Sequence, residues 1–266
     1  GFYALYSNTT GFENTANGFF SLQQNLTGSN NTANGSNSLL NNTIGTNNTA
    51  SGSSSLQQNT TGINNTAMGY NSLKYNSTGS NNTSSGSFSL ITNTTGSDNV
   101  GVGADALGQN TEGGNNVAIG AYALDANTTA SNNTAVGSVA LTNNTTGNRN
   151  TSFGVQSMTS NTSGYYSTAV GYSASHRATT GAHNVSVGNT ALYKTTTAGY
   201  NTAVGSGALF ESNSGNNSEN EENTLPSRRR RKSSGGGRIR KTLKIKRTKR
   251  NNKSKNNKNQ KKNIDI

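Results

Sequence analysis

The sequence contains no cysteine, no tryptophan and a single proline, Pro226, in 266 residues. Without cysteine the chain can form neither a disulfide framework nor a thiolate metal site. Its two histidines, His176 and His183, have no neighbouring carboxylate or cysteine to complete a metal-ligand set, so we expect no metal and no other cofactor. No run approaches the roughly 18 apolar residues of a membrane span.

Motifs of enzymatic sites are also missing. No G-x-S-x-G turn stands in a strand–helix context, and the chain has no phosphate-binding loop and no calcium-binding nonapeptide. We therefore expect no enzymatic activity. No secretory signal peptide is recognisable, but Gly1 already falls inside a repeat, so this absence excludes no compartment.

Large apolar residues are scarce. Leu, Ile, Val and Phe make up about 15% of the chain, below the roughly 20% at which disorder is expected. Intrinsic disorder is therefore one interpretation. Against it stands a strict repeat, because disordered low-complexity sequence drifts in length. An invariant period indicates that each copy rests on the same site of its neighbour, as in a solenoid.

The repeat is built on pentapeptides such as N-T-A-V-G, at Asn133–Gly137 and Asn201–Gly205. Twelve copies open seventeen residues apart, and no copy gains or loses a residue. We number each copy from its opening residue as position zero. The opening residues are Asn14, Asn31, Asn48, Asn65, Asn82, Asn99, Asn116, Asn133, Asn150, Ser167, Asn184 and Asn201.

Glycine recurs at positions four and fourteen, which predicts two turns that need positive φ or close backbone approach. The short segments between them favour strands, since seventeen residues cannot hold two helices of about ten residues each. We expect two short strands per coil and an all-β parallel β-roll or β-solenoid. At about 4.8 Å per coil, some thirteen coils make a rod of about 60 Å.

Positions two, seven and eight predict the interior. Positions two and seven are small, and position eight is Leu in ten of the twelve full copies, with Met158 and Ser175 as exceptions. Uniform side chains of this kind suit a thin, tightly packed core. The predicted core residues are Leu22, Leu39, Leu56, Leu73, Leu90, Leu107, Leu124, Leu141, Met158, Leu192 and Leu209.

Position three lies on the opposite face of its strand from position two. It is polar in the early coils and apolar in the later ones, which predicts an apolar stripe outside the rod and a partner surface, in the simplest case for identical chains. The other interpretation places position three in the core. The predicted stripe is Met68, Val102, Ile119, Val136, Phe153, Val170, Val187 and Val204.

Asparagine recurs at positions zero, eleven and sixteen, and stacked copies can form amide ladders. We interpret these asparagines as structural. Asn-x-Thr sequons, for example at Asn25 and Asn59, follow automatically from the repeat.

The pentapeptides N-T-A-V-G, N-V-A-I-G (Asn116–Gly120) and N-V-S-V-G (Asn184–Gly188), each followed by a small residue and Leu, resemble the YadA-like head repeats of trimeric autotransporter adhesins and viral fibre proteins. The resemblance covers residues 1–217 and implies left-handed coils, a trimer and adhesion to a host or matrix surface. The unit here is longer than the usual head repeat because of an N-T-T-G insertion. Neck, stalk and membrane-anchoring barrel are absent from the sequence given, which argues against self-display.

Charge divides the chain into three segments. Residues 1–217 form the repeat region, 218–227 an acidic linker, and 228–266 a tail with eighteen Lys and Arg against Asp265 alone. Such dense like charge predicts disorder and non-specific binding of a polyanion or nucleic acid through phosphates. The residues expected to bind it are Arg228, Arg229, Arg230, Arg231, Lys232, Arg238, Arg240, Lys241, Lys244, Lys246, Arg247, Lys249 and Arg250.

The sequence thus predicts a non-enzymatic fibre or head module at an extracellular, cell or virion surface. One alternative is a virion-associated or nucleic-acid-tethered fibre protein anchored by its basic tail. The lesser alternative is an ice-binding solenoid, which needs threonines at alternate positions. The pair Thr60–Thr61 is adjacent instead, so we expect no ice binding.

Overall fold

A computed structural model describes residues 1–212, 215 and 217–220. These residues belong to one compact unit, Gly1–Thr224, while the second unit, Leu225–Ile266, lies outside the described residues. The regular elements of the described part are thirteen β-strands, and no helix in it is long and apolar enough to cross a membrane.

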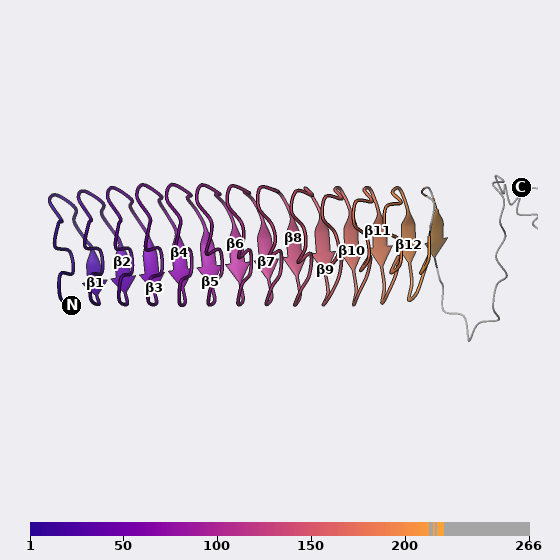
Figure 1. Cartoon of the computed structure of the whole chain (residues 1–266), viewed down its shortest axis with the longest axis horizontal. Coiled ribbons are helices and arrows are strands. Elements are labelled where there is room, and N and C mark those ends of the chain that lie inside the picture. Colours follow the sequence, from indigo (N-terminus) through magenta and orange to yellow (C-terminus); the bar gives the residue numbers. More distant parts are fainter. Residues whose placement is uncertain (213–214, 216, 221–266) are drawn as a thin grey trace, which may run out of the picture. The chain divides into compact units, whose positions relative to one another are not determined.

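All thirteen strands belong to one parallel sheet, in which each strand pairs with the next in chain order. Figure 1 shows the coils stacked along one axis with their strands in a single row. Each strand has three residues and occupies positions one to three of its coil in β1–β12. The strands are β1 Thr15–Asn17, β2 Thr32–Asn34, β3 Thr49–Ser51, β4 Thr66–Met68, β5 Thr83–Ser85, β6 Val100–Val102, β7 Val117–Ile119, β8 Thr134–Val136, β9 Thr151–Phe153, β10 Thr168–Val170, β11 Val185–Val187, β12 Thr202–Val204 and β13 Ser218–Asn220.

The register of the sheet repeats the period of the sequence. Thr15 pairs with Thr32 and Ala16 with Ala33, and each following pair from β2 to β12 keeps the same offset. The predicted all-β solenoid of 17-residue coils is therefore confirmed. The last pair differs, because Thr202 lies opposite Ser218, one residue short of a full period. The sheet thus continues into residues that we assigned to the acidic linker.

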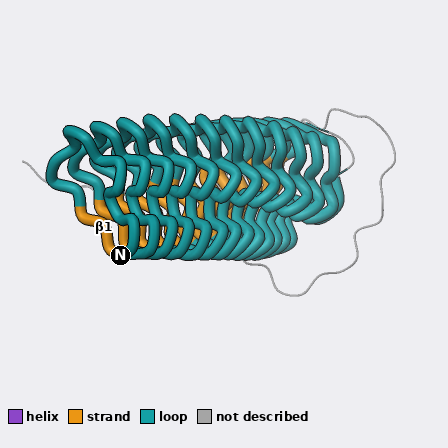
Figure 2. The backbone as a smooth tube through the Cα atoms, turned by 60° about the vertical axis from the view of Figure 1, so that its left-hand side comes forward, coloured by secondary structure: helices purple, strands orange, loops and turns teal. Residues whose placement is uncertain are grey.

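The prediction of two strands per coil is wrong, since each coil has one. Positions six and eight hold residues in the left-handed conformation, such as Phe20 (φ 57°) and Leu22 (φ 50°), and this alternation turns the chain where a second strand would need extended backbone. The segment nevertheless bonds to its neighbour, as in Leu22 N to Ser38 O at 3.0 Å. In Figure 2 the strands form one band and turns make up the rest of each coil.

The glycine at position four ends each of the strands β1–β12. Gly120 has φ +130°, and a Cβ placed on it would lie 2.6 Å from both the carbonyl carbon and oxygen of Gly137 in the next coil. Both conditions that the sequence predicted for a glycine turn therefore hold at this position. At position fourteen only close approach applies: a Cβ on Gly45 would lie 2.5 Å from the carbonyl oxygen of Gly62.

The core is a narrow column between the sheet and the turns. Ten of the predicted core residues, from Leu22 to Leu192, are at most 1% exposed, whereas Leu209 is partly buried against the last cluster. A left-handed leucine costs about 1–2 kcal/mol. Complete burial of its side chain contributes about 1.5–3 kcal/mol, which offsets that cost.

Two buried amide ladders flank the leucine column. At position eleven, Asn42 donates from Nδ2 to Oδ1 of Asn25 at 2.7 Å and to the carbonyl of Gly45 in its own coil at 2.9 Å. At position zero, Asn48 donates from its backbone N to Oδ1 of Asn31 at 3.0 Å. These asparagines are completely buried, so they hold the interior in register as the sequence predicted.

Position sixteen is different. Its asparagines are exposed and left-handed, as at Asn64 (φ 56°), a conformation that Asn tolerates well. A side-chain ladder occurs there between Asn64, Asn81 and Asp98, at 3.2 and 3.0 Å. The main reason for asparagine at this position is therefore the turn.

Candidate interaction surface

The outer face of the sheet forms a continuous surface along the solenoid. Within strand β7, Ala118 is completely buried, Val117 is half-buried and Ile119 is 41% exposed. Positions one and three therefore point outward together, and position two points into the core. Because the strands are in register, each of these positions forms a column along the solenoid.

The predicted stripe at position three lies on this outer face. Its more exposed members have between 36% and 55% of their surface accessible, and they are Met68, Val102, Ile119, Phe153 and Val204. Its other members, Val136, Val170 and Val187, are half-buried between neighbouring side chains. Position three therefore lies outside the core of a single chain.

Sequence reasoning missed position one, which shares this face. It is Thr in most coils and Val in Val100, Val117 and Val185. The strand alternation that placed position three outward applies equally to position one, two residues earlier, so the signal was present in the sequence. The two columns together make a face that is polar near β1 and largely apolar from β6 onward.

The threonines considered for ice binding lie elsewhere. Thr60 donates its hydroxyl to the carbonyl of Ser77 at 2.9 Å, while Thr61 is exposed beside it. Successive coils repeat this bond, as between Thr94 and Thr111 at 3.0 Å. This hydroxyl column therefore helps to hold the coils together, and the adjacent threonines do not form a paired array on one face.

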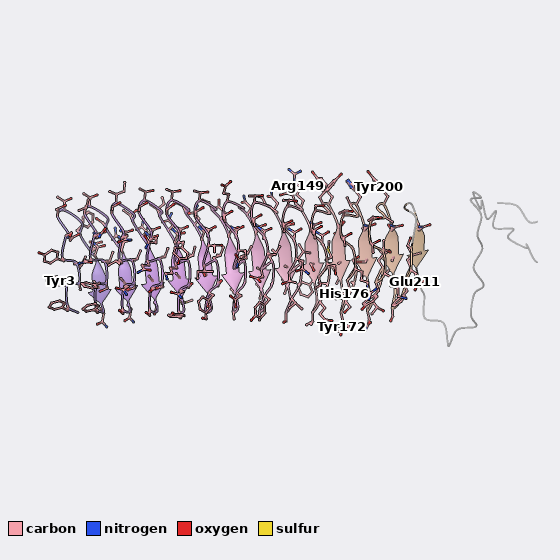
Figure 3. All side chains as sticks on the ribbon, in the orientation of Figure 1. Tyr3, Arg149, Tyr172, His176, Tyr200 and Glu211 are labelled. Carbon is pink, nitrogen blue, oxygen red and sulfur yellow. The ribbon has the colours of Figure 1, made fainter. Side chains whose placement is uncertain are left out.

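Aromatic residues form exposed stacks outside the turns, which the sequence analysis did not foresee. His183 lies between Tyr166 and Tyr200, with ring centroids 5.3 and 4.8 Å away and planes within 14° of parallel. His176 stacks on Tyr193 at 5.2 Å. In Figure 3 Tyr200 lies on the upper edge and His176 in the lower half. The signal was the recurrence of rings seventeen residues apart in these columns.

No group of three His, Cys, Asp or Glu side chains in the described part of the chain could hold a metal ion. The charges there are few. Lys194 forms an ion pair with Glu211 in the next coil, and both side chains are largely exposed. Burial, and secondarily the carboxylate of Asp105, raise the pKa of Asp125 above its usual value.

The residues predicted to bind polyanions, from Arg228 to Arg250, lie outside the described residues, and so does the remainder of the linker. A scan against models of protein families, a search of curated proteins and a search of solved structures each found no match to this chain.

Proposed function

We propose that this chain is a non-enzymatic structural module, a repetitive fibre or head region that binds identical chains through its outer sheet face and attaches to a host, matrix or other surface. The observation that carries the proposal is the outward apolar column at position three from Val102 to Val204, which Ser85 separates from Met68. A β-solenoid fold is compatible with a structural fibre. The family resemblance adds the expectation of left-handed coils and a trimer.

Exposed apolar side chains and their repetition both favour self-association. Contiguous apolar patches beyond a few hundred Å² are rare on monomeric proteins and mark interaction sites. From Val102 to Val204 the residue at position three is apolar in every coil, and the column keeps its register. An identical chain offers the same period, so one favourable contact between two coils is repeated along the whole interface.

The first experiment measures the mass of the full chain by sedimentation equilibrium. The unmodified chain is expected to be a trimer. Replacing Met68, Val102 and Ile119 together by Lys places three charges on the stripe and should yield monomers with unchanged circular dichroism. The matched control replaces Asn17, Asn34 and Ser51 by Lys, at the same position of polar coils, and should stay trimeric. A monomeric unmodified chain would contradict the proposed assembly.

Attachment is tested by the number of coils. Deleting residues 31–81 removes three whole coils and restores the period, because Asn82 then follows Asn30. If many weak contacts act together, the affinity for immobilised fibronectin, collagen or intact cells should fall by a much larger factor than the number of coils does. Equal binding by the shortened chain would place adhesion at a single site and contradict a repetitive adhesive surface.

A further inference from the structure

One coil, Ser167–His183, lacks interior residues that most other coils share. Ser167 replaces Asn at position zero, and Ser175 replaces Leu at position eight. Ala178 replaces the Asn that every earlier coil has at position eleven, and the two coils that follow have Thr195 and Ser212 there. Each of these positions is buried. The leucine column therefore has a gap at this level of the solenoid, and the asparagine column at position eleven ends there.

The hydrophobic core divides at this coil. One buried cluster extends from Leu22 to Ala174, and a second consists of Ala191, Leu192, Ala203 and Ala208. Ser175 lies between them and instead contacts Ser186 through their hydroxyl groups at 2.8 Å. The leucine column thus has a polar gap between Met158 and Leu192.

The position-eleven ladder ends at this coil. The position-zero ladder continues through Ser167, whose backbone N donates to Oδ1 of Asn150 at 3.1 Å and whose hydroxyl oxygen accepts from the backbone N of Asn184 at 3.2 Å. In a regular coil, the carbonyl of Gly164 accepts hydrogen bonds from Asn150 at 2.8 Å and from Asn161 at 3.1 Å. Neither Ser167 nor Ala178 has a side-chain amide that could donate to the corresponding carbonyl of Gly181. Asn161 Oδ1 is buried without a hydrogen-bond partner among the described residues, because the side chain that should donate to it belongs to Ala178.

The backbone does not share this interruption. Strand β10 pairs in register with both β9 and β11, as Thr168 does with Thr151 and Val185. The coil therefore stacks normally through its main chain, while its side-chain interior contributes less than that of its neighbours.

Outside the turns, two aromatic stacks cross this level. Tyr166, His183 and Tyr200 form one, extended by the Arg149 guanidinium carbon 5.1 Å from the Tyr166 ring centre. His176, Tyr193 and Phe210 form the other, with successive ring centroids 5.2 Å apart. Both histidines belong to the interrupted coil. In Figure 3 Arg149 lies at the upper edge and His176 in the lower half, so the two stacks are at different places around the coil.

We propose that the coil Ser167–His183 is a joint at which the solenoid opens into two parts, residues 1–166 and 184–212, and that the two aromatic stacks hold the joint closed. The stability of a solenoid is close to a sum of terms between neighbouring coils, so the weakest neighbour term decides where it separates. Local opening follows such boundaries.

Hydrogen exchange of the full chain, followed by mass spectrometry, tests this. Backbone amides in 184–212 should exchange at least about tenfold faster than those in 116–166, with a step at the joint. A gradual decline toward the end of the solenoid, without a step, would overturn the proposal.

A variant in which this coil has the regular interior residues distinguishes opening at the joint from ordinary fraying of the terminus. The triple variant Ser167→Asn, Ser175→Leu, Ala178→Asn should bring protection in 184–212 to the level of 116–166. If the triple variant does not fold, the single Ala178→Asn variant should raise protection in the same segment. Protection identical to the unmodified chain in the folded variant would overturn the proposal.

Substitutions in the aromatic stacks test whether the stacks hold the joint closed. Replacing His176 and His183 by Ala should lower protection in 184–212 about tenfold and leave 31–132 unchanged. The control is Phe19→Ala, which removes a comparable stack with Phe2, 6.0 Å between ring centroids, far from the joint. Phe19→Ala should not affect 184–212. Unchanged protection in the double histidine variant would show that the stacks do not close the joint.

Discussion

Asn161 donates its side-chain amide to Oδ1 of Asn144 at 2.7 Å, but its own Oδ1, although buried, accepts no hydrogen bond from the described residues. Each preceding asparagine of this ladder accepts from the amide one coil further along, as Asn127 does from Asn144 at 3.1 Å. The ladder ends here because position eleven of the next coil is Ala178. A buried acceptor without a partner costs about 1–3 kcal/mol.

Extending the ladder should therefore stabilise the solenoid. We expect Ala178→Asn to raise the free energy of unfolding by about 1–2 kcal/mol, because the new amide donates to Asn161 and to the carbonyl of Gly181. Urea denaturation followed by circular dichroism measures this. The opposite change, Asn93→Ala, breaks the bonds to Asn76 and Gly96, at 2.8 and 2.9 Å, and should lower stability by about 3 kcal/mol. Equal urea midpoints for Ala178→Asn and Asn93→Ala would contradict a stabilising contribution of the ladder.

Glycine at position four is required by the neighbouring coil. Gly120→Ala should cost at least about 3 kcal/mol, because the added methyl group meets the backbone of Gly137 in a region of φ that alanine avoids. Gly207→Ala is the matched control: Gly207 has φ +69°, but nothing lies within 4 Å of its added Cβ. That variant should cost only about 1–2 kcal/mol. Thermal denaturation of the two variants distinguishes the steric clash from conformational strain. Similar losses of stability in Gly120→Ala and Gly207→Ala would refute the contribution of the clash.

Asp125 makes the stability of the solenoid depend on pH. Since burial raises the pKa of this carboxyl above 3.8 in the folded chain, the unfolded chain loses the proton first as pH rises. Stability should then fall from pH 3.8 upward until the folded group is also ionised, and stay lower above that point. Asp125→Asn should match the unmodified chain near pH 3 and exceed its stability at pH 7.

The neighbouring carboxylate offers a control for the same measurement. Asp105 is the second cause of the raised pKa of Asp125. Asp105→Asn should therefore reduce the gain in free energy of unfolding that Asp125→Asn gives at pH 7. Some of that gain should remain, because Asp125 is still buried. Denaturant midpoints from pH 3 to 7 report both effects. A larger gain in stability from Asp125→Asn at pH 3 than at pH 7 would contradict the raised pKa of Asp125.

The sequons divide by burial. Asn59, within Asn59-Thr60-Thr61, is completely buried in the ladder, whereas Asn64, within Asn64-Asn65-Thr66, is exposed. A soluble N-glycosyltransferase acting on the folded chain should modify Asn64 at least about tenfold more than Asn59, because a protected site is modified only through local opening. Peptide mass spectrometry measures the occupancies. The urea-denatured chain, which should lose this preference, is the control.

Much of the fold could be read from the repeat. An invariant period of seventeen residues required equivalent contacts between neighbours, and the contrast between positions two, three and eight predicted what is buried. The buried asparagines also followed, since a stacked amide can donate to the copy below it. Chain order alone gives these features because each coil contacts only its neighbours.

Other features depend on three-dimensional geometry. The left-handed residues Phe20 and Leu22 replace the expected second strand, although nothing in a leucine side chain predicts positive φ; the cost is met by its burial in the stack. The extra strand Ser218–Asn220 pairs one residue out of period, which a search for period seventeen cannot detect.

The sequence by itself determined that this chain is a stack of identical coils and which face of each coil carries its leucine. Only the tertiary structure decided that a coil has one strand, that positions one and three share an outer face, and that His183 stacks between Tyr166 and Tyr200 beside an interrupted interior. The physical reason is that the period fixes which residues are neighbours, whereas the backbone path within the period fixes where their side chains point.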